Sequence, residues 1–269
     1  MTAYLLDDRY NAVVTGALSA GSEVSTYPVS NLQDPSGGAS RQWRTLATVT
    51  SAGGATIDID AGSAAATWRA LCLFRTNLTL AATIRWVVGT TAGGSDVHDT
   101  GTVSAGVVAT WGQSVTLLGA SVTGRYCRCY IDDPDNADGH IGVALAYAGP
   151  VTTLLPGLAT GQQWIPRAVG RAPSETRSGG IPRRAGFVRR MWPARVEYTG
   201  VAGSDAIEAL RATVQAGGNV GMIADFPALG GLGKTTLYGT LADHGAGGPT
   251  HQTARADLMT QEFTIMEAI

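Results

Sequence analysis

The stretch Thr56-Ile-Asp-Ile-Asp60 alternates apolar and polar side chains at the two-residue period of a β-strand. Comparable strand-like runs follow through the first half of the chain, separated by turns that contain Gly, Asp or Pro. Their spacing is typical of an antiparallel β-sandwich. The series ends near Pro150, so we expect a sandwich over residues 1–150, with strands near 56–60, 68–74, 83–88, 113–118, 125–131 and 140–147.

Residues 151–269 show a different order of elements. A strand is expected around Arg195-Val-Glu-Tyr198, followed by an amphipathic helix that Asp205 caps, with Glu208 completing a capping box. The pair Gly217-Gly218 predicts the end of this helix. We therefore expect a smaller α+β unit, with one helix docked on a sheet, and a chain that is mainly β; further strands are predicted at 220–224, 235–241 and 256–267.

The charge, the N-terminus and the cysteines of the chain bear on its partners, its compartment and its metal content. The formal net charge is −2, which gives no global attraction to nucleic acid or to an anionic membrane. The N-terminus carries acids where a signal peptide would be basic, and no apolar run reaches membrane-spanning length, so we expect folding in a cytoplasm. Cys72, Cys127 and Cys129 are interpreted as small buried hydrophobic residues, and no Cys/His pattern predicts a metal site.

Two motifs imitate ligand sites. Residues 228–235 satisfy a loose P-loop pattern, but a strand-like run follows where a P-loop needs a helix, so we expect a glycine-rich connection and no cofactor. Residues 132–139 offer several carboxylate and amide oxygens that would suit calcium. Their spacing does not match an EF-hand loop, so an Asx-rich turn between two strands is the favoured interpretation.

The segment 167–195 carries eight arginines against the single acid Glu175. We interpret it as an Arg-rich arm whose guanidinium groups pair with carboxylates of neighbouring subunits. A solvated loop and a contact with nucleic-acid phosphates are the alternatives, but no aromatic ladder or recognition helix supports nucleic acid. The candidate interface residues are Arg177, Arg183, Arg184, Arg189 and Arg190.

Four tryptophans, at positions 43, 68, 86 and 111, are spread through the first half. They could form a platform for stacking sugars, although core packing is the favoured fate of most of them. No nucleophile-elbow or zinc-protease motif occurs, so we do not expect an enzyme. A pair of carboxylates for glycoside hydrolysis stays open, because its spacing is a three-dimensional property.

Three segments carry a resemblance to a known family: Tyr27-Pro-Val-Ser-Asn-Leu-Gln-Asp-Pro35 leading to Arg41-Gln-Trp-Arg44, residues 69–78, and residues 125–143. They resemble the discoidin-like, galactose-binding-type sandwich at the front of many tailed-phage virion proteins. The second half is similar in layout to the C-terminal part of minor tail proteins.

This resemblance implies a virion structural protein of the tail tip, either a distal or a minor tail protein, assembled in the bacterial host cytoplasm. It implies a closed hexameric or trimeric ring that contacts tail-tube and hub proteins. The alternative is a carbohydrate-binding adhesion module that recognises a host surface glycan through loops of the sandwich. Its candidate residues are Asn31, Trp43 and Arg44.

Overall fold

The computed structural model describes residues 2–38, 40–51, 53–108, 111–154, 156–158, 165–169, 187–224, 231–242, 250–252 and 255–268. Within these ranges the strands form three antiparallel sheets, and the longest helix is α2 (Gly200–Gln215). The mainly β class, with a sandwich followed by an α+β unit, is thereby confirmed. No helix in the described ranges is long and apolar enough to cross a membrane.

The sandwich pairs a six-stranded sheet with a four-stranded sheet. The first runs in the order β2 (Ala17–Ala20), β4 (Thr56–Asp60), β10 (Tyr126–Asp132), β6 (Thr83–Gly89) and β7 (His98–Asp99), with β8 (Val103–Ser104) also on β6. The second runs β3 (Trp43–Arg44), β11 (Gly142–Gly149), β5 (Ala66–Thr76) and β9 (Ser114–Gly124).

Alternation decides which side chains enter the core between these two sheets. On β10 the even positions are half-buried, whereas Cys127, Cys129 and Ile131 point inward and are buried. Ile57 and Ile59 of β4 join them in the same cluster. The cysteines are free thiols, as expected for small hydrophobic residues.

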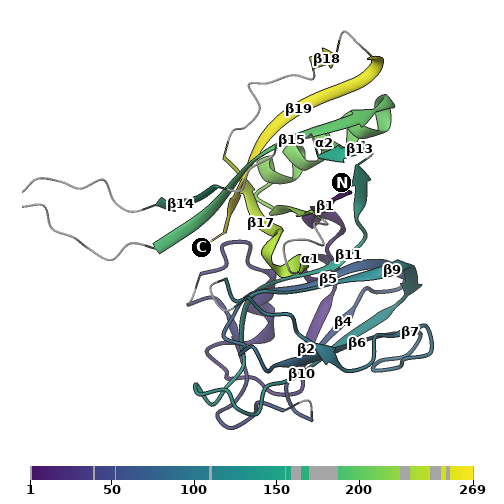
Figure 1. Cartoon of the computed structure of the whole chain (residues 1–269). Helices are drawn as coiled ribbons and strands as arrows, with labels where there is room; N and C mark the ends of the chain where they lie inside the picture. The colour runs from purple at the N-terminus through teal and green to yellow at the C-terminus, as the bar shows by residue number, and fades with distance from the viewer. Residues whose placement is uncertain are drawn as a thin grey trace, which may run out of the picture.

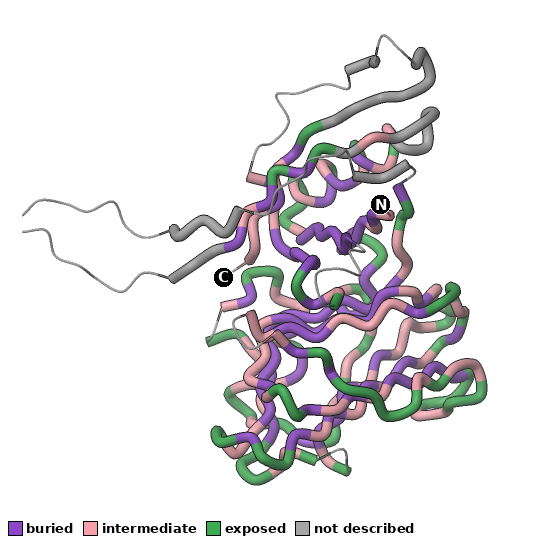
Figure 2. Tube along the Cα trace, viewed as in Figure 1, coloured by how far each residue is buried: buried purple, intermediate pink, exposed green. Residues whose placement is uncertain are grey.

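The other face of the four-stranded sheet packs on a third sheet. This nine-stranded sheet contains β12 (Thr152–Leu154), β1 (Ala3–Asp7), β16 (Val220–Ala224), β17 (Thr236–Leu241), β19 (Arg255–Glu267), β15 (Phe187–Thr199) and β13 (Pro156–Leu158), with β14 (Ile165–Val169) on β15 and β18 (Thr250–Gln252) on β19. Between the sheets the Phe74 and Tyr238 rings stack with centroids 4.7 Å apart. Strand β11 is buried along its whole length as a result (Figures 1 and 2).

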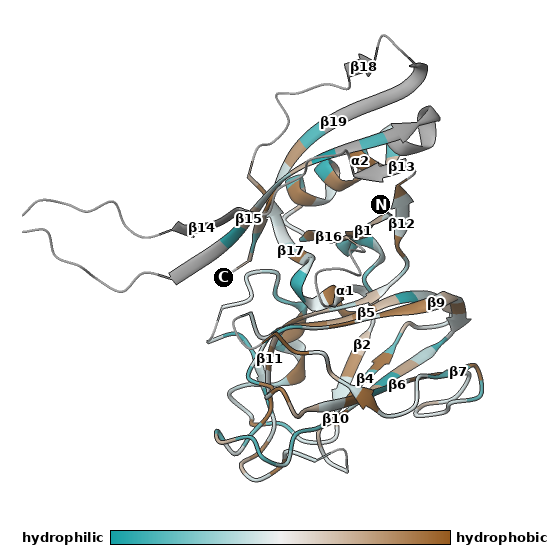
Figure 3. Cartoon of the chain, viewed as in Figure 1, coloured by the Kyte–Doolittle hydropathy of each residue, from teal (hydrophilic) through white to brown (hydrophobic). Residues whose placement is uncertain are grey.

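Helix α2 covers the opposite face of the nine-stranded sheet, so the molecule is a stack of four layers (Figure 1). Ile207 and Leu210 point into this core, and Figure 3 shows hydrophobic and hydrophilic residues alternating along the helix. The helix ends in a Schellman motif, because the Gly218 N–H donates to the Thr213 carbonyl at 2.9 Å. The predicted end is confirmed, whereas the predicted N-cap is wrong: the helix begins at Gly200, directly after β15, and Asp205 lies exposed inside it.

The first strand departs from the predicted division of the chain. Strand β1 lies between β12 and β16, so residues 3–7 belong to the nine-stranded sheet and the sandwich is inserted between β1 and β12. Two short helical turns, η1 (Asp8–Tyr10) and α1 (Ala12–Thr15), lead from β1 into the sandwich. Residues 3–7 of β1 form a short apolar run that does not alternate, and such a run carries no signal of which sheet a strand joins.

Buried polar contacts tie the two units together near η1. The Asp8 carboxylate accepts hydrogen bonds from the Tyr238 hydroxyl and from Asn11 Nδ2, the latter at 2.9 Å. Asn11 also donates to the Ala146 carbonyl at 3.0 Å and accepts from the Ala148 N–H at 3.0 Å. Burial raises the pKa of Asp8. Because each buried group has a partner, the units are held in one arrangement.

Candidate functional site

The outer face of the six-stranded sheet packs against no other sheet in the described part of the chain, and polar and aromatic side chains occupy it. They come from the outward positions of β4, β10 and β6, because their inward neighbours fill the sandwich core. We call this surface the polar face, and define it by Asp58, Asp60, Arg85, Tyr126, Arg128 and Tyr130.

Strand register brings these side chains together. Central strand β10 places Arg128 opposite Asp58 of β4, and Tyr126 opposite Asp60. On its other side Tyr130 lies opposite Arg85 of β6. Directly opposed residues on one face of a sheet are in contact, so each charge of the polar face meets an opposite charge or a ring.

Ion pairs orient the charged groups of this face. Arg128 Nε donates to Asp58 Oδ1 at 2.5 Å, and Arg125 binds both oxygens of Asp60 at 2.8 Å. Hydrogen bonds from the Arg125 side chain, and then from the Gly62 N–H, lower the pKa of Asp60 to about 2. This carboxylate therefore stays charged at any physiological pH.

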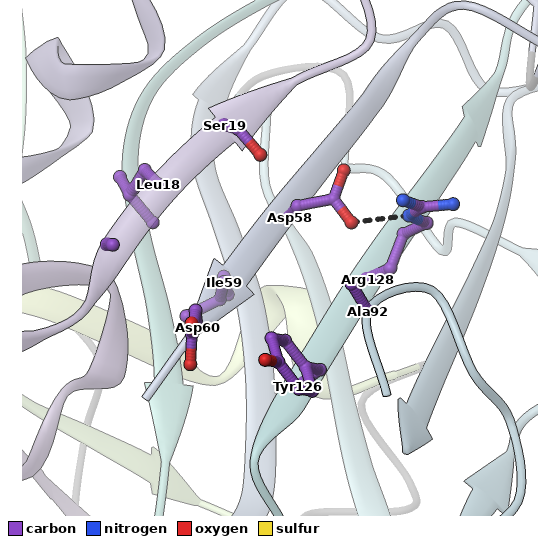
Figure 4. A pocket seen from close by; sticks show the side chains of 9 residues that line it. Leu18, Ser19, Asp58, Ile59, Asp60, Ala92, Tyr126 and Arg128 are labelled. Carbon is purple, nitrogen blue, oxygen red and sulfur yellow. Dashed lines mark hydrogen bonds and ion pairs between the residues drawn. The ribbon is translucent and has the colours of Figure 1, made fainter. Parts of the chain in front are cut away.

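A depression of about 330 Å³ opens beside these pairs (Figure 4). Its floor and walls come from β2, β4 and β10, and Ala92 of the β6–β7 loop closes one side; the lining includes Leu18, Ser19, Asp58, Asp60, Tyr126 and Arg128. The loop approaches closely, because a Cβ on Gly93 would lie 2.6 Å from Arg128 Nη1, and Gly93 has a φ of +71°. Glycine adopts this φ without strain, whereas another residue would be strained there and would displace the end of the Arg128 side chain.

A second, smaller depression of about 90 Å³ lies farther along the same strand, lined by Thr83, Ile84, Arg85, Thr102, Tyr130 and Asp132. Two guanidinium groups flank the Tyr130 ring, that of Arg85 at 5.5 Å and that of Arg128 at 5.7 Å from the ring centroid. Arg85 is itself held by two hydrogen bonds to Asp99, at 2.9 and 2.6 Å. Oriented acceptors, oriented donors and tyrosine rings thus line both depressions.

The residues predicted to bind a glycan lie elsewhere. Trp43 is fully buried in the sandwich core, where its Nε1 donates to the Ser22 carbonyl at 3.1 Å, so it offers no surface to a ligand. Asn31, on η2 (Val29–Gln33), is half-buried and donates to the Gln42 carbonyl at 3.0 Å. Arg44 stacks over the Tyr27 ring at 4.1 Å. Trp43 and Arg44 form β3 of the four-stranded sheet and Asn31 lies on η2, so none of the three lies on the strands β4, β10 and β6 that form the polar face.

A tryptophan platform is not formed either. Trp68 and Trp86 are buried in the same core as Trp43, in agreement with the favoured interpretation. Trp111 lies at the junction of the two units, where the Arg190 guanidinium stacks over its ring at 4.6 Å. The polar face was missed because its signal is distributed: only the alternation of residues 56–60 and 126–130, taken together, places aspartates, arginine and tyrosines on one surface.

Of the five arginines proposed as subunit contacts, three (Arg177, Arg183 and Arg184) lie outside the described residues. Arg189 lies on β15, opposite Arg167 of β14, but its side chain is outside the described part. Arg190 is fully buried and pairs within the chain, with Glu267 at 2.5 Å and with Gln113 Oε1 at 2.6 Å. The proposal of a subunit contact is therefore wrong for Arg190, because its own fold already occupies the guanidinium.

The two motifs that imitate ligand sites have structural roles. The end of the P-loop-like segment forms a short turn, η4 (Leu232–Lys234), and strand β17 follows, as predicted. In the acidic turn, buried Asp133 accepts from the Thr79 N–H at 2.8 Å and from Asn136 Nδ2 at 2.9 Å. Its oxygens thus bind a neighbouring loop residue and the turn itself, and the described residues contain no cluster of three potential metal ligands.

Comparisons with known proteins give structural similarities. No protein-family model matches the chain, and no curated protein sequence matches it. Chitosan-binding module 1 of a Paenibacillus sp. IK-5 chitosanase/glucanase is 15% identical, with a TM-score of 0.38 over 52% of this chain and 99% of the module. The family 32 carbohydrate-binding module of C. perfringens NanJ, solved with galactose, is 12% identical, with a TM-score of 0.38 over 55% of this chain and 98% of the module. The lectin binding domain of Lectinolysin, solved with Lewis b, is 12% identical, with a TM-score of 0.37 over 51% of this chain and 94% of the domain.

Proposed function

We propose that the polar face binds carbohydrate and that the chain is a glycan-recognition protein. The observation that carries this proposal is the larger depression, where the Tyr126 ring lies among the ion-paired groups of Asp58, Asp60 and Arg128. Sugar hydroxyls both donate and accept hydrogen bonds, so they suit carboxylate acceptors and guanidinium donors side by side. The apolar face of a sugar ring suits an aromatic side chain. Because the ion pairs hold these groups in place, binding needs little ordering of side chains.

A glycan array tests this proposal. We expect the whole chain to bind a discrete set of glycans, and the Tyr126→Ala variant to lose about two- to tenfold in affinity, because one aromatic contact is worth about 0.5–1.5 kcal/mol. Tyr10→Ala is the matched control, since Tyr10 is 59% exposed and lies on η1, away from the polar face. An array without binding, or equal loss in both variants, would count against the proposal. Asp58→Asn gives a second test that keeps the shape of the face.

We further propose that binding is not followed by a reaction, so bound glycans should be recovered intact after incubation with the protein. Release of shortened sugars in this turnover assay would contradict that statement.

The second candidate is a structural role in the tail tip of a tailed bacteriophage, as a hexameric or trimeric ring that meets tail-tube and hub proteins. The observation that favours it is the ribbon formed by β15 and β19, each 13 residues long and paired from Met191–Met266 to Thr199–Leu258. This ribbon carries the described ends of the Arg-rich segment and extends beyond the body of the sheet (Figure 1). Light scattering with negative-stain microscopy tests it: a ring supports the role, and a monomer that is absent from phage particles opposes it.

A further inference from the structure

The two depressions of the polar face lie on one strand. Tyr126 and Arg128 line the larger one, and Tyr130 and Asp132 line the smaller one, so all four are outward residues of β10. At about 3.3 Å per residue, the centres of the two pairs are about 13 Å apart along the strand. That separation is greater than one sugar ring can bridge.

The strip between the depressions is continuous and polar. The Arg128 guanidinium, which lines the larger depression, donates from Nη1 to the Tyr130 hydroxyl at 3.4 Å. The Tyr130 ring lines the smaller depression and has Arg85 on its other side. A ligand that lies along β10 therefore meets polar groups and rings over its whole length.

Three ion pairs neutralise six charged side chains of this strip, and Asp132 in the smaller depression adds one carboxylate. Asp58 and Arg128 pair across it, as do Asp60 with Arg125 and Arg85 with Asp99. Their side chains keep between 23% and 44% of their surface exposed, so they remain open to hydroxyl groups. Because most of its charges are paired, the strip gives a charged sugar of either sign little electrostatic attraction, whereas the paired groups still offer hydrogen bonds to neutral hydroxyls.

We infer that the polar face binds an extended, uncharged oligosaccharide that lies along β10, with one sugar unit in each depression and at least one between them. This inference rests on the proposed function and specifies its ligand. An oligosaccharide that fills both depressions makes its second contact without a second bimolecular association. Its affinity therefore rises with the number of sugar units until both depressions are filled.

The test measures affinity against chain length by calorimetry, using uncharged cello-, malto- and β-galacto-oligosaccharides of one to six units and the whole protein. We expect at least one series to gain tenfold or more between two and five units and then to level off. Thr102→Leu, which fills the smaller depression, should abolish this gain and leave the affinity for the disaccharide unchanged. Tyr130→Ala should also abolish the gain with chain length. Thr102 is exposed, so its replacement fills the depression with little effect on folding.

The outcomes separate the inference from the proposed function. Binding with equal affinity at all lengths would overturn the extended ligand and leave glycan recognition intact. Tighter binding of oligogalacturonate or chitosan oligosaccharides than of every uncharged series would overturn the charge argument. No binding of any sugar would overturn both the extended ligand and glycan recognition. A dimer in light scattering that Tyr126→Ala dissociates would also overturn both, because a second copy of the chain would then occupy the face.

Discussion

Glu267→Gln should destabilise the protein far more than an equivalent change nearby on the same strand. Glu267 of β19 accepts from Arg190 Nε at 3.0 Å and from Nη2 at 2.5 Å. The Arg190 side chain is 0% exposed, and it also contacts Gln113 and the Trp111 ring, both from the sandwich. The pair therefore lies where the sandwich meets the nine-stranded sheet.

The expected magnitude follows from leaving a guanidinium charge in a buried site. Removing one partner of a buried ion pair costs about 3–5 kcal/mol, because the remaining charge keeps its desolvation penalty. With a urea m-value of about 3 kcal/mol/M, the unfolding midpoint falls by about 1–2 M. The matched control is Glu262→Gln, also on β19, where the carboxylate is 77% exposed and lies 3.9 Å from Arg195. This exposed pair is worth at most about 1 kcal/mol.

Urea unfolding of both variants, followed by tryptophan fluorescence, measures the difference. Trp111, one of the six tryptophans, lies against Arg190, so part of the change in emission arises at the junction. If Glu267→Gln shifted the midpoint no more than Glu262→Gln does, Arg190 would not be held by a buried pair, and the rigid connection of the two units would be refuted.

Three further predictions concern the sandwich. Gly93→Ala should lower the free energy of unfolding by about 1–2 kcal/mol and weaken glycan binding, because its φ is +71° and the new methyl group meets Arg128; calorimetry on native and variant protein checks both effects. Titration of Asp60 should not change the affinity for sugar between pH 8 and pH 5, because the Arg125 hydrogen bonds lower its pKa from 3.8 to about 2. The stabilisation from this pair is therefore present above pH 3.8 and is lost only as the pH falls through 2. Cys127 should react with a thiol reagent only after unfolding, because burial raises its pKa and covers the sulfur; labelling before denaturation would contradict this.

The longer strands of the sandwich were predictable: β4 and β10 alternate because one face lies in the core, whereas β11 is an apolar run that is buried along its whole length. The short strands β2, β7 and β8 were not predicted. The run 56–60 is the clearest case, and β4 has those bounds. The helix end at Gly217 was predictable for a different reason: its φ of +87° is one that glycine adopts without strain. The capping-box signal at Asp205 misled, because the same residues are compatible with the interior of a helix that starts directly after a strand.

Long-range pairing accounts for the parts that were not predictable. Nothing in residues 3–7 indicates that β1 joins strands more than two hundred residues away. Arg190 lies in an arginine-rich segment that suggests exposure, and only its position opposite Glu267 and Gln113 makes it a buried group. The polar face likewise depends on β4, β10 and β6 lying side by side, which local periodicity does not specify.

The most direct test of glycan recognition by the polar face is an NMR titration of the labelled whole chain with the oligosaccharide that binds best. We expect backbone amide shifts to change along residues 58–60 and 126–132 and to saturate as the sugar is added. Changes confined to the segment around Asn31 and Arg44, or no saturable change with any sugar, would contradict this expectation.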